Sequence, residues 1–503
     1  MKTRSIYSSA SVLILGRGLS FLFTFFLPMF LARKLPPADY GTFKQIFLIF
    51  STLYLILQAG MVQSLYYFVP REPERRATWV LQSLLVLSVT GVASGAGILF
   101  FGAKLSALFS NPALGAFIPR LALFTAVMIA ASYFEAVLVS EEKVAAGSAV
   151  LFFSEALRSL FILLPLLIFH TLSGIVFGLI AFSLLRFAAS FSYTCTLLSR
   201  REKPGPVFSW GTLKTQLAYS LPFGAAIVVD VLQENLHQYT VAYLFDAATF
   251  AFYSVGMLQI PIVDLFYTPM SELLIVRMGR LLREGSQPER LALWVEMTTR
   301  LALLFIPMAV YFCLIAYDLL LLFFTETYAG SVPLFRIGVM TVLLASFLTE
   351  GMLRCHAQAR FFLLIPILKV LLTLLLMIPM IKLWGLLGAV VATVVVAGIG
   401  KLLMLWKIRR LMEASWSEFL PWRELGGIFF LATVIACSLA FFRETLPLPP
   451  LPALLLFSLL YWTFFGLALF FFPFLPESIR TEIRERAASL RQGAPKAPDL
   501  TSN

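Results

Sequence analysis

Long apolar runs separated by short polar connectors dominate this sequence. Each run is close to or above the roughly 20 residues that a helix needs to cross the hydrocarbon core of a bilayer. Within lipid, a helix satisfies its own backbone hydrogen bonds, so each run predicts a transmembrane helix. We therefore expect an all-α, multi-pass membrane protein with about fourteen such helices, although twelve or thirteen also fit. The runs cover residues 8–32, 42–69, 78–103, 114–140, 145–169, 172–198, 214–244, 248–276, 291–323, 332–356, 361–382, 384–406, 425–442 and 451–475.

Composition excludes several classes of protein. The chain is 60% hydrophobic and 13% charged, against about 45–50% and about 25% in soluble domains. The net charge of +12 would indicate nucleic-acid binding in a soluble protein, but here it is typical of cytoplasmic loops, so nucleic acid is not an expected partner. The four cysteines form no CxxC pair and the three histidines no HExxH motif. We therefore predict neither a metal site nor a cofactor. The sequence contains no P-loop motif, so we do not expect it to bind ATP.

The distribution of positive charge predicts the orientation. With a cytoplasmic amino terminus, the inner connectors and the tail carry 25 Lys and Arg residues and the outer connectors carry 6. This asymmetry predicts that both termini are cytoplasmic. The first run is too long for the apolar part of a signal peptide, so we expect it to be a retained span.

Three pairs of segments predict an internal repeat of about 210 residues. A repeat of six spans enters the membrane from the same side in both copies, which predicts two lobes related by an axis along the membrane normal and facing a central cavity. The expected domains are two six-helix lobes at 1–200 and 201–410, two further helices at 411–476 and a cytoplasmic tail at 477–503. The matched segments are Leu35–Phe43 with Phe245–Tyr253, Leu105–Gly115 with Leu320–Gly330, and Ser173–Gly178 with Trp384–Gly388.

Four short motifs carry a family resemblance: Phe30–Arg33, Leu35–Gly41, Tyr328–Gly330 leading to Pro333–Arg336, and Trp384–Ala389. With the predicted architecture, they resemble the polysaccharide flippase (Wzx-type) branch of the multidrug/oligosaccharidyl-lipid/polysaccharide (MOP) exporter superfamily, whose fold is MATE-like. The resemblance implies a transporter, not an enzyme, that moves a polyprenyl-diphosphate-linked oligosaccharide from the inner to the outer leaflet by alternating access. It further implies a bacterial inner-membrane location and, as partners, the bilayer, H+ or Na+ as a coupling ion, and proteins of a polysaccharide pathway.

Three arginines lie deep in the first six predicted spans: Arg17, Arg158 and Arg186. A charge at such a depth costs about 2.5–3.5 kcal/mol on the insertion scale and usually faces the bundle interior. A lipid diphosphate would supply bidentate acceptors, so we predict that these arginines bind the substrate anion. Glu155 lies three residues before Arg158, a spacing that allows an intrahelical pair. Pairing with a carboxylate on another helix, or snorkelling to the interface, is the structural alternative.

The second half of the chain carries acidic residues instead. Asp230, Glu234 and His237 have spacings of four and three residues, which places them on one face of a helix. Adjacent carboxylates at low dielectric favour sharing a proton or binding a cation, so we predict a role in ion coupling. An interlobe gate formed with Arg17 or Arg186 is the alternative.

Two spacings of four residues predict pairs that neutralise themselves within one helix: Glu296 with Arg300, and Glu350 with Arg354.

Two other functions remain open. A multidrug or cation antiporter of the same superfamily would need a cavity dominated by acidic groups. A membrane glycan polymerase or ligase would be expected to need a sizeable outer loop, whereas the outer connectors predicted here are short. The identity of the glycan does not follow from the sequence.

Overall fold

The computed structural model describes residues 22–23, 25–141, 143–200, 208–446 and 448–471, and every regular element within these ranges is a helix. Eleven helices of the described part are long and apolar enough to cross a membrane. The predicted all-α, multi-pass architecture is thus confirmed, while the total of fourteen spans stays a prediction. Most of the first predicted span lies outside the described residues.

Two compact units divide the chain, and neither is continuous in sequence. The first comprises Met1–Gly256, Phe323–Ser331 and Pro366–Thr393, and the second comprises Met257–Leu322, Val332–Ile365 and Val394–Asn503. The helices of the first are α2 (Pro37–Leu57), α3 (Met61–Arg71), η1 (Pro73–Arg75), α4 (Arg76–Leu108), η2 (Pro112–Phe117), α5 (Ile118–Ala130), α6 (Phe134–Ser140), α7 (Val144–Phe169), α8 (Leu172–Ser199), α9 (Trp210–Leu244), α10 (Ala247–Gly256) and η3 (Glu326–Ser331). Those of the second are α11 (Ile262–Glu284), α12 (Gln287–Phe324), α13 (Val332–Gly338), α14 (Thr341–Leu344), α15 (Thr349–Cys355), α17 (Trp416–Phe419), α18 (Trp422–Thr445) and α19 (Pro450–Phe471). The long helix α16 (Ala359–Leu411) contributes to both units, as the last residues of α12 contribute to the first.

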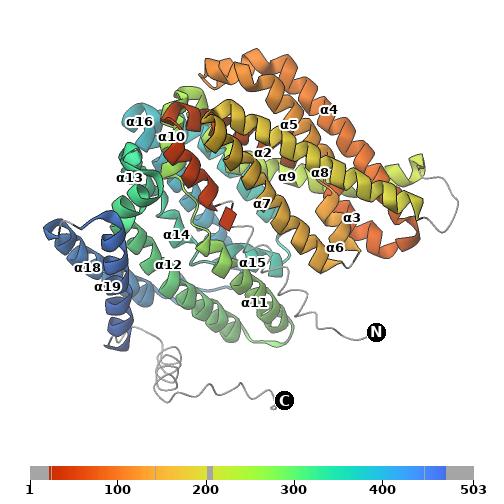
Figure 1. The fold of residues 1–503 in the computed structure, drawn as a ribbon. Helices are drawn as coiled ribbons and strands as arrows, with labels where there is room; N and C mark the ends of the chain where they lie inside the picture. The colour runs from red at the N-terminus through yellow and green to blue at the C-terminus, as the bar shows by residue number, and fades with distance from the viewer. Residues whose placement is uncertain (1–21, 24, 142, 201–207, 447, 472–503) are drawn as a thin grey trace, which may run out of the picture. The chain divides into compact units, whose positions relative to one another are not determined.

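The first unit packs its long helices side by side around an aromatic core. In Figure 1, α4, α5 and α8 run alongside one another, and the contacts of α5 with both neighbours agree. Phe68 of α3 stacks on Trp79 of α4 with ring centroids 4.3 Å apart, and Tyr133 beside them is fully buried. Offset stacking of this kind adds to the burial of large apolar area.

The second unit is held by aromatic side chains that also donate hydrogen bonds. Trp294 of α12 stacks on Phe419 of α17 at 5.1 Å, and its indole nitrogen donates to the carbonyl of Phe419 at 3.0 Å. Tyr461 of α19 donates to the carbonyl of Pro307 in α12 at 2.9 Å. These contacts anchor the last helices of the chain on α12 within this unit.

Two of the three predicted repeat pairs have matching local structure. Helix α2 begins at Pro37 and α10 at Ala247, each directly after a two-residue break and separated by the predicted spacing of 210. A Cβ built on Gly41 would lie 1.7 Å from the carbonyl oxygen of Ala247, so the two helix starts touch through the glycine backbone. Likewise α4 and α12 each end just before a residue with positive φ, Ser110 at 46° and Thr325 at 79°, and a short 3-10 helix follows.

Four predicted runs are not single helices. Run 114–140 comprises part of η2 followed by α5 and α6, which still lie within one candidate membrane span, Pro112–Ser140. Run 42–69 breaks between α2 and α3, where Ala59 and Gly60 have φ of 47° and 73°. Run 248–276 breaks between α10 and α11 just before Pro261, which lacks the N–H that would continue a helix. Run 332–356 consists of the three short helices α13, α14 and α15, which nevertheless lie within one candidate membrane span, Glu326–Cys355. Hydropathy averaged over a window does not reveal these breaks, because most residues around them are apolar.

The predicted boundary between runs 361–382 and 384–406 lies inside α16. Trp384 and Gly385 leave the helical region there, and Gly385 has φ of 59° and ψ of −138°, which a residue with a Cβ rarely adopts. A Cβ on Gly388 would lie 1.9 Å from the carbonyl oxygen of Met380. Gly385 therefore allows the sharp turn within α16, and Gly388 allows the backbone after the turn to lie against Met380 before it.

Candidate functional site

The first unit contains a cluster of buried charges on three helices of apolar sequence. Arg186 of α8 forms an ion pair with Glu135 of α6, with 3.0 Å between Nη2 and Oε1. Its Nη1 donates to Ser154 Oγ of α7 at 2.7 Å. The Arg186 side chain is only 10% exposed, so most of its charge is compensated by protein groups rather than by solvent.

A second pair lies on α7 in the same cluster. Arg158 and Glu155 form the predicted intrahelical ion pair, and both side chains are less than one fifth exposed. Tyr54 of α2 interacts electrostatically with all four charged groups, so the two pairs lie in the same region of the first unit. We call this group, formed by Glu135, Ser154, Glu155, Arg158 and Arg186, the arginine cluster.

Both arginines of the cluster have unused donors. The Nε atoms of Arg158 and Arg186 are buried and have no hydrogen-bond partner within the described part of the chain. A guanidinium presents five N–H donors, and leaving a buried one unpaired costs about 1–3 kcal/mol. The cluster can thus accept further oxygen atoms, provided that its side chains rearrange to expose these donors.

The structure brings two of the three predicted anion-binding residues together. Arg158 and Arg186 share the cluster, whereas Arg17 lies outside the described residues. For Arg186 the structural alternative considered from the sequence is also present, because its carboxylate partner comes from another helix. With two arginines and two glutamates, the cluster carries no net charge in this state.

The predicted acidic face lies on α9. Asp230 and Glu234 are exposed in this structure, whereas His237 is half-buried. The Nδ1 atom of His237 lies 2.7 Å from the hydroxyl of Tyr253 on α10. His237 is therefore held by a structural contact within the first unit, while the two carboxylates extend from the same helix.

The second unit contains a buried ion pair that sequence reasoning missed. Lys401 of α16 lies 3.2 Å from Glu350 Oε1 on α15. The predicted partner of Glu350 is wrong: Arg354 instead lies over the ring of Phe362, 5.4 Å from its centroid. A lone lysine inside the apolar run 384–406 was the available signal. By contrast, the predicted pair of Glu296 and Arg300 is present at 2.9 Å.

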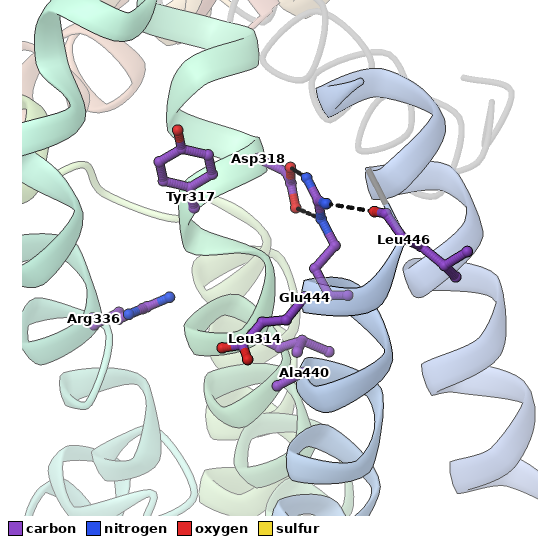
Figure 2. A pocket seen from close by; sticks show the side chains of 8 residues that line it. Leu314, Tyr317, Asp318, Arg336, Ala440, Glu444 and Leu446 are labelled. Atoms are coloured by element: carbon purple, nitrogen blue, oxygen red, sulfur yellow. Dashed lines mark hydrogen bonds and ion pairs between the residues drawn. The ribbon is translucent and has the colours of Figure 1, made fainter. Parts of the chain in front are cut away.

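A further pair missed from the sequence joins α12 and α18. Arg443 binds Asp318 through two bonds, Nη2 to Oδ1 at 2.7 Å and Nε to Oδ2 at 3.0 Å, and also donates to the carbonyl of Leu446 at 3.1 Å (Figure 2). A hollow of about 320 Å³ lies beside this pair, with Tyr317 and Arg336 also in its wall. The fork geometry indicates a structural clamp between the two helices.

Metal-binding groups do not cluster in the described residues. No group of three or more His, Cys, Asp or Glu side chains there is arranged to hold a metal ion.

Comparison with known proteins points to one family and one fold. A family model described as "Polysaccharide biosynthesis protein" matches residues 30–333. No curated protein matches the chain in sequence.

Among solved structures, the lipid II flippase MurJ in an inward-closed conformation shares 13% identity with a TM-score of 0.71, and the match covers 90% of this chain and 98% of that one. An inward-facing multidrug resistance MATE family transporter of the MOP superfamily shares 15% identity over 79% of this chain and 96% of its own, with a TM-score of 0.57. A MOP superfamily transporter from Pyrococcus furiosus shares 15% identity over 81% and 95%, with a TM-score of 0.51. At these identities the likeness is one of fold.

Proposed function

Because this chain belongs to the polysaccharide biosynthesis protein family, we propose that it moves a polyprenyl-diphosphate-linked oligosaccharide from the inner to the outer leaflet of a bacterial cytoplasmic membrane. The movement would proceed by alternating access of the two predicted six-helix lobes, with both termini in the cytoplasm. The observation that carries the proposal is the arginine cluster, which keeps two guanidinium groups within apolar helices of the first unit.

The chemistry of the cluster matches the anionic part of such a substrate. A diphosphate offers several oxygen atoms in the geometry that a guanidinium binds bidentately. The unpaired Nε donors of Arg158 and Arg186 supply binding capacity beyond the existing ion pairs. In this proposal the two arginines hold the diphosphate and Arg17 contributes a third contact.

The carboxylates of the cluster act as internal substitutes for the substrate. Without an anion, an unpaired arginine at this depth would be strongly destabilising, and Glu135 prevents this by pairing with Arg186. When the diphosphate enters, its oxygens replace Glu135 as acceptors. The released carboxylate can then take up a proton or move with α6, which links substrate binding to a change in the helices.

The acidic face of α9 provides the proposed coupling element. Asp230 and Glu234 are four residues apart and exposed, so they can share a proton or bind Na+ from a water-filled cavity. Their alternative role as a gate that pairs with Arg17 or Arg186 predicts a different mutant behaviour, which is treated in the Discussion.

A transport assay with purified protein tests the proposal. The protein is reconstituted in liposomes that contain a fluorescent polyprenyl-diphosphate-linked oligosaccharide, and the label in the outer leaflet is quenched by a membrane-impermeant reductant. We expect faster loss of protected label with protein than without it, and chemically unchanged glycolipid. Efflux of cationic dyes without glycolipid movement would instead support the antiporter, and lengthened or transferred glycan would support a polymerase or ligase.

A further inference from the structure

The ammonium of Lys401 is surrounded by oxygen atoms of the second unit. Its Nζ lies 3.0 Å from Thr349 Oγ1, 3.2 Å from the carbonyl oxygen of Phe347, and 3.2 and 3.3 Å from the two carboxylate oxygens of Glu350. Tyr267 of α11 and Thr349 both donate to the same carboxylate. We call these oxygen groups, provided by Phe347, Thr349 and Glu350, the oxygen cage.

The cage exceeds what an ordinary ion pair requires. An ammonium has three donors, and here four acceptors from three residues lie within hydrogen-bond distance. Carboxylate, hydroxyl and carbonyl oxygens are the groups with which membrane transporters coordinate monovalent cations, often where a helix is interrupted. The backbone of Leu348, just before α15, has a non-helical ψ of 51° and lies between two of the cage residues.

The cage is also enclosed. The Lys401 side chain is 10% exposed and that of Glu350 is 33% exposed. A carboxylate in such a place needs a compensating cation, because an unpaired charge inside an apolar span is strongly destabilising. Protonation, a free cation or a charged side chain can each balance such a carboxylate, and here the side chain of Lys401 lies beside it.

We infer that the oxygen cage is a monovalent-cation site whose cation is built into the chain as the ammonium of Lys401. In the wild-type protein the oxygen cage therefore needs no free ion. Coupling to an ion gradient would then use other residues of the chain. If the ammonium is removed, the site is expected to accept a small free cation such as Na+, K+ or methylammonium. This inference concerns the second unit and does not depend on which substrate is transported.

Thermal unfolding of the purified full-length protein tests the inference. The Lys401→Ala variant and wild type are unfolded in NaCl, KCl, methylammonium chloride and choline chloride at one ionic strength. We expect the variant to have a lower Tm than wild type in choline, whose quaternary ammonium is bulky and has no N–H donor. With at least one small cation, its Tm should rise with the logarithm of cation concentration, as for any ligand that binds only the folded state.

Three controls isolate the cage. Wild type and the Lys382→Ala variant, which changes an exposed lysine of the same helix, should give the same Tm in all four salts. Lys401→Met fills the space without charge and should show no cation response. The double variant Lys401→Ala/Glu350→Ala removes the anionic ligand and should also be unresponsive.

Two outcomes would overturn the inference. One is a Lys401→Ala variant that folds but has the same Tm in all four salts. The other is a Lys401→Ala variant that is recovered in none of the salts while the uncharged double variant is recovered in all, because the ammonium would then be a partner that no free cation replaces. Both readouts use the folded protein without glycolipid, so they stand apart from the outcome of the transport assay.

Discussion

The guanidinium of Arg186 on α8 lies 3.0 Å from the carboxylate of Glu135 on α6, although 51 positions separate the two residues in sequence. The same guanidinium donates to Ser154 on α7. One side chain thus ties three helices of the first unit together at the place proposed for the diphosphate. Mutation can separate the structural role of Arg186, which is to link the three helices, from its proposed role in binding the diphosphate.

The paired charges of Arg186 and Glu135 should be removable without loss of folding. Removing only the arginine leaves the half-buried carboxylate of Glu135 without its partner, which is destabilising. The double change Arg186→Gln/Glu135→Gln keeps hydrogen bonding and removes both charges. We expect it to reach the membrane at normal levels and to lose glycolipid movement in the liposome assay. Arg280→Gln, at an exposed ion pair, is the control, and normal transport by the double variant would contradict the role of Arg186.

Neutralising Glu135 alone should strengthen anion binding. If Glu135 competes with the diphosphate for Arg186, Glu135→Gln removes the competitor. Since a hydrogen bond to a charged group contributes about 1.5–3 kcal/mol, the affinity for inorganic diphosphate should rise about tenfold to a hundredfold. Isothermal titration calorimetry measures the change, with Glu284→Gln at an exposed pair as the matched control. An unchanged or weaker affinity would exclude competition.

The amide variants Asp230→Asn and Glu234→Gln distinguish ion coupling from gating. An amide still forms hydrogen bonds but cannot ionise, so in a coupling role at least one variant should transport at a rate independent of an imposed pH or Na+ gradient. In a gating role both should keep the gradient dependence and instead change the balance of inward-open and outward-open states. Transport in liposomes with imposed gradients decides, and unchanged gradient dependence in both variants eliminates coupling.

The close backbone contact at Gly388 should not tolerate a side chain. A Cβ there would lie 1.9 Å from the carbonyl oxygen of Met380, so Gly388→Val must separate the backbone on the two sides of the turn in α16. Overpacking typically costs about 1–3 kcal/mol, and we expect a lower Tm in detergent. Gly398→Ala, in the same helix but with no atom within 4 Å of its Cβ position, should leave the Tm unchanged or raise it. Equal Tm values for the two variants would argue against the contact.

Single cysteines test the predicted orientation. Ala38 and Thr327 are exposed and are predicted to be outside, so cysteines there should react with an impermeant maleimide in intact cells. Cysteines at Glu74 and Gly285 should react only after permeabilisation. Asn111, on the same predicted outer side, is a poor labelling site because its amide is buried and donates to Thr42 and Gln45. The background protein needs its four native cysteines replaced, and the reverse labelling pattern would reject the orientation.

Much of the fold was predictable because it follows from local rules. Long apolar runs form helices in a membrane since no other open structure satisfies their backbone groups there. The repeated helix starts at Pro37 and Ala247 were visible because turns need particular residues at fixed places. The pairs Glu155 with Arg158 and Glu296 with Arg300 followed from helix geometry alone.

The remaining contacts were decided by packing between helices. Glu350 had a partner at helical spacing in Arg354, yet it binds Lys401, 51 positions away, because α16 brings the ammonium into an oxygen cage that also includes Thr349 and Phe347. Arg186 and Glu135 meet for the same reason. The sequence by itself determined which segments are apolar enough to enter a membrane and which charges lie within those segments, since hydropathy and helical spacing are properties of neighbouring residues. Only the tertiary structure decided which of those charges meet, because the rotation of each helix about its axis depends on every helix packed against it.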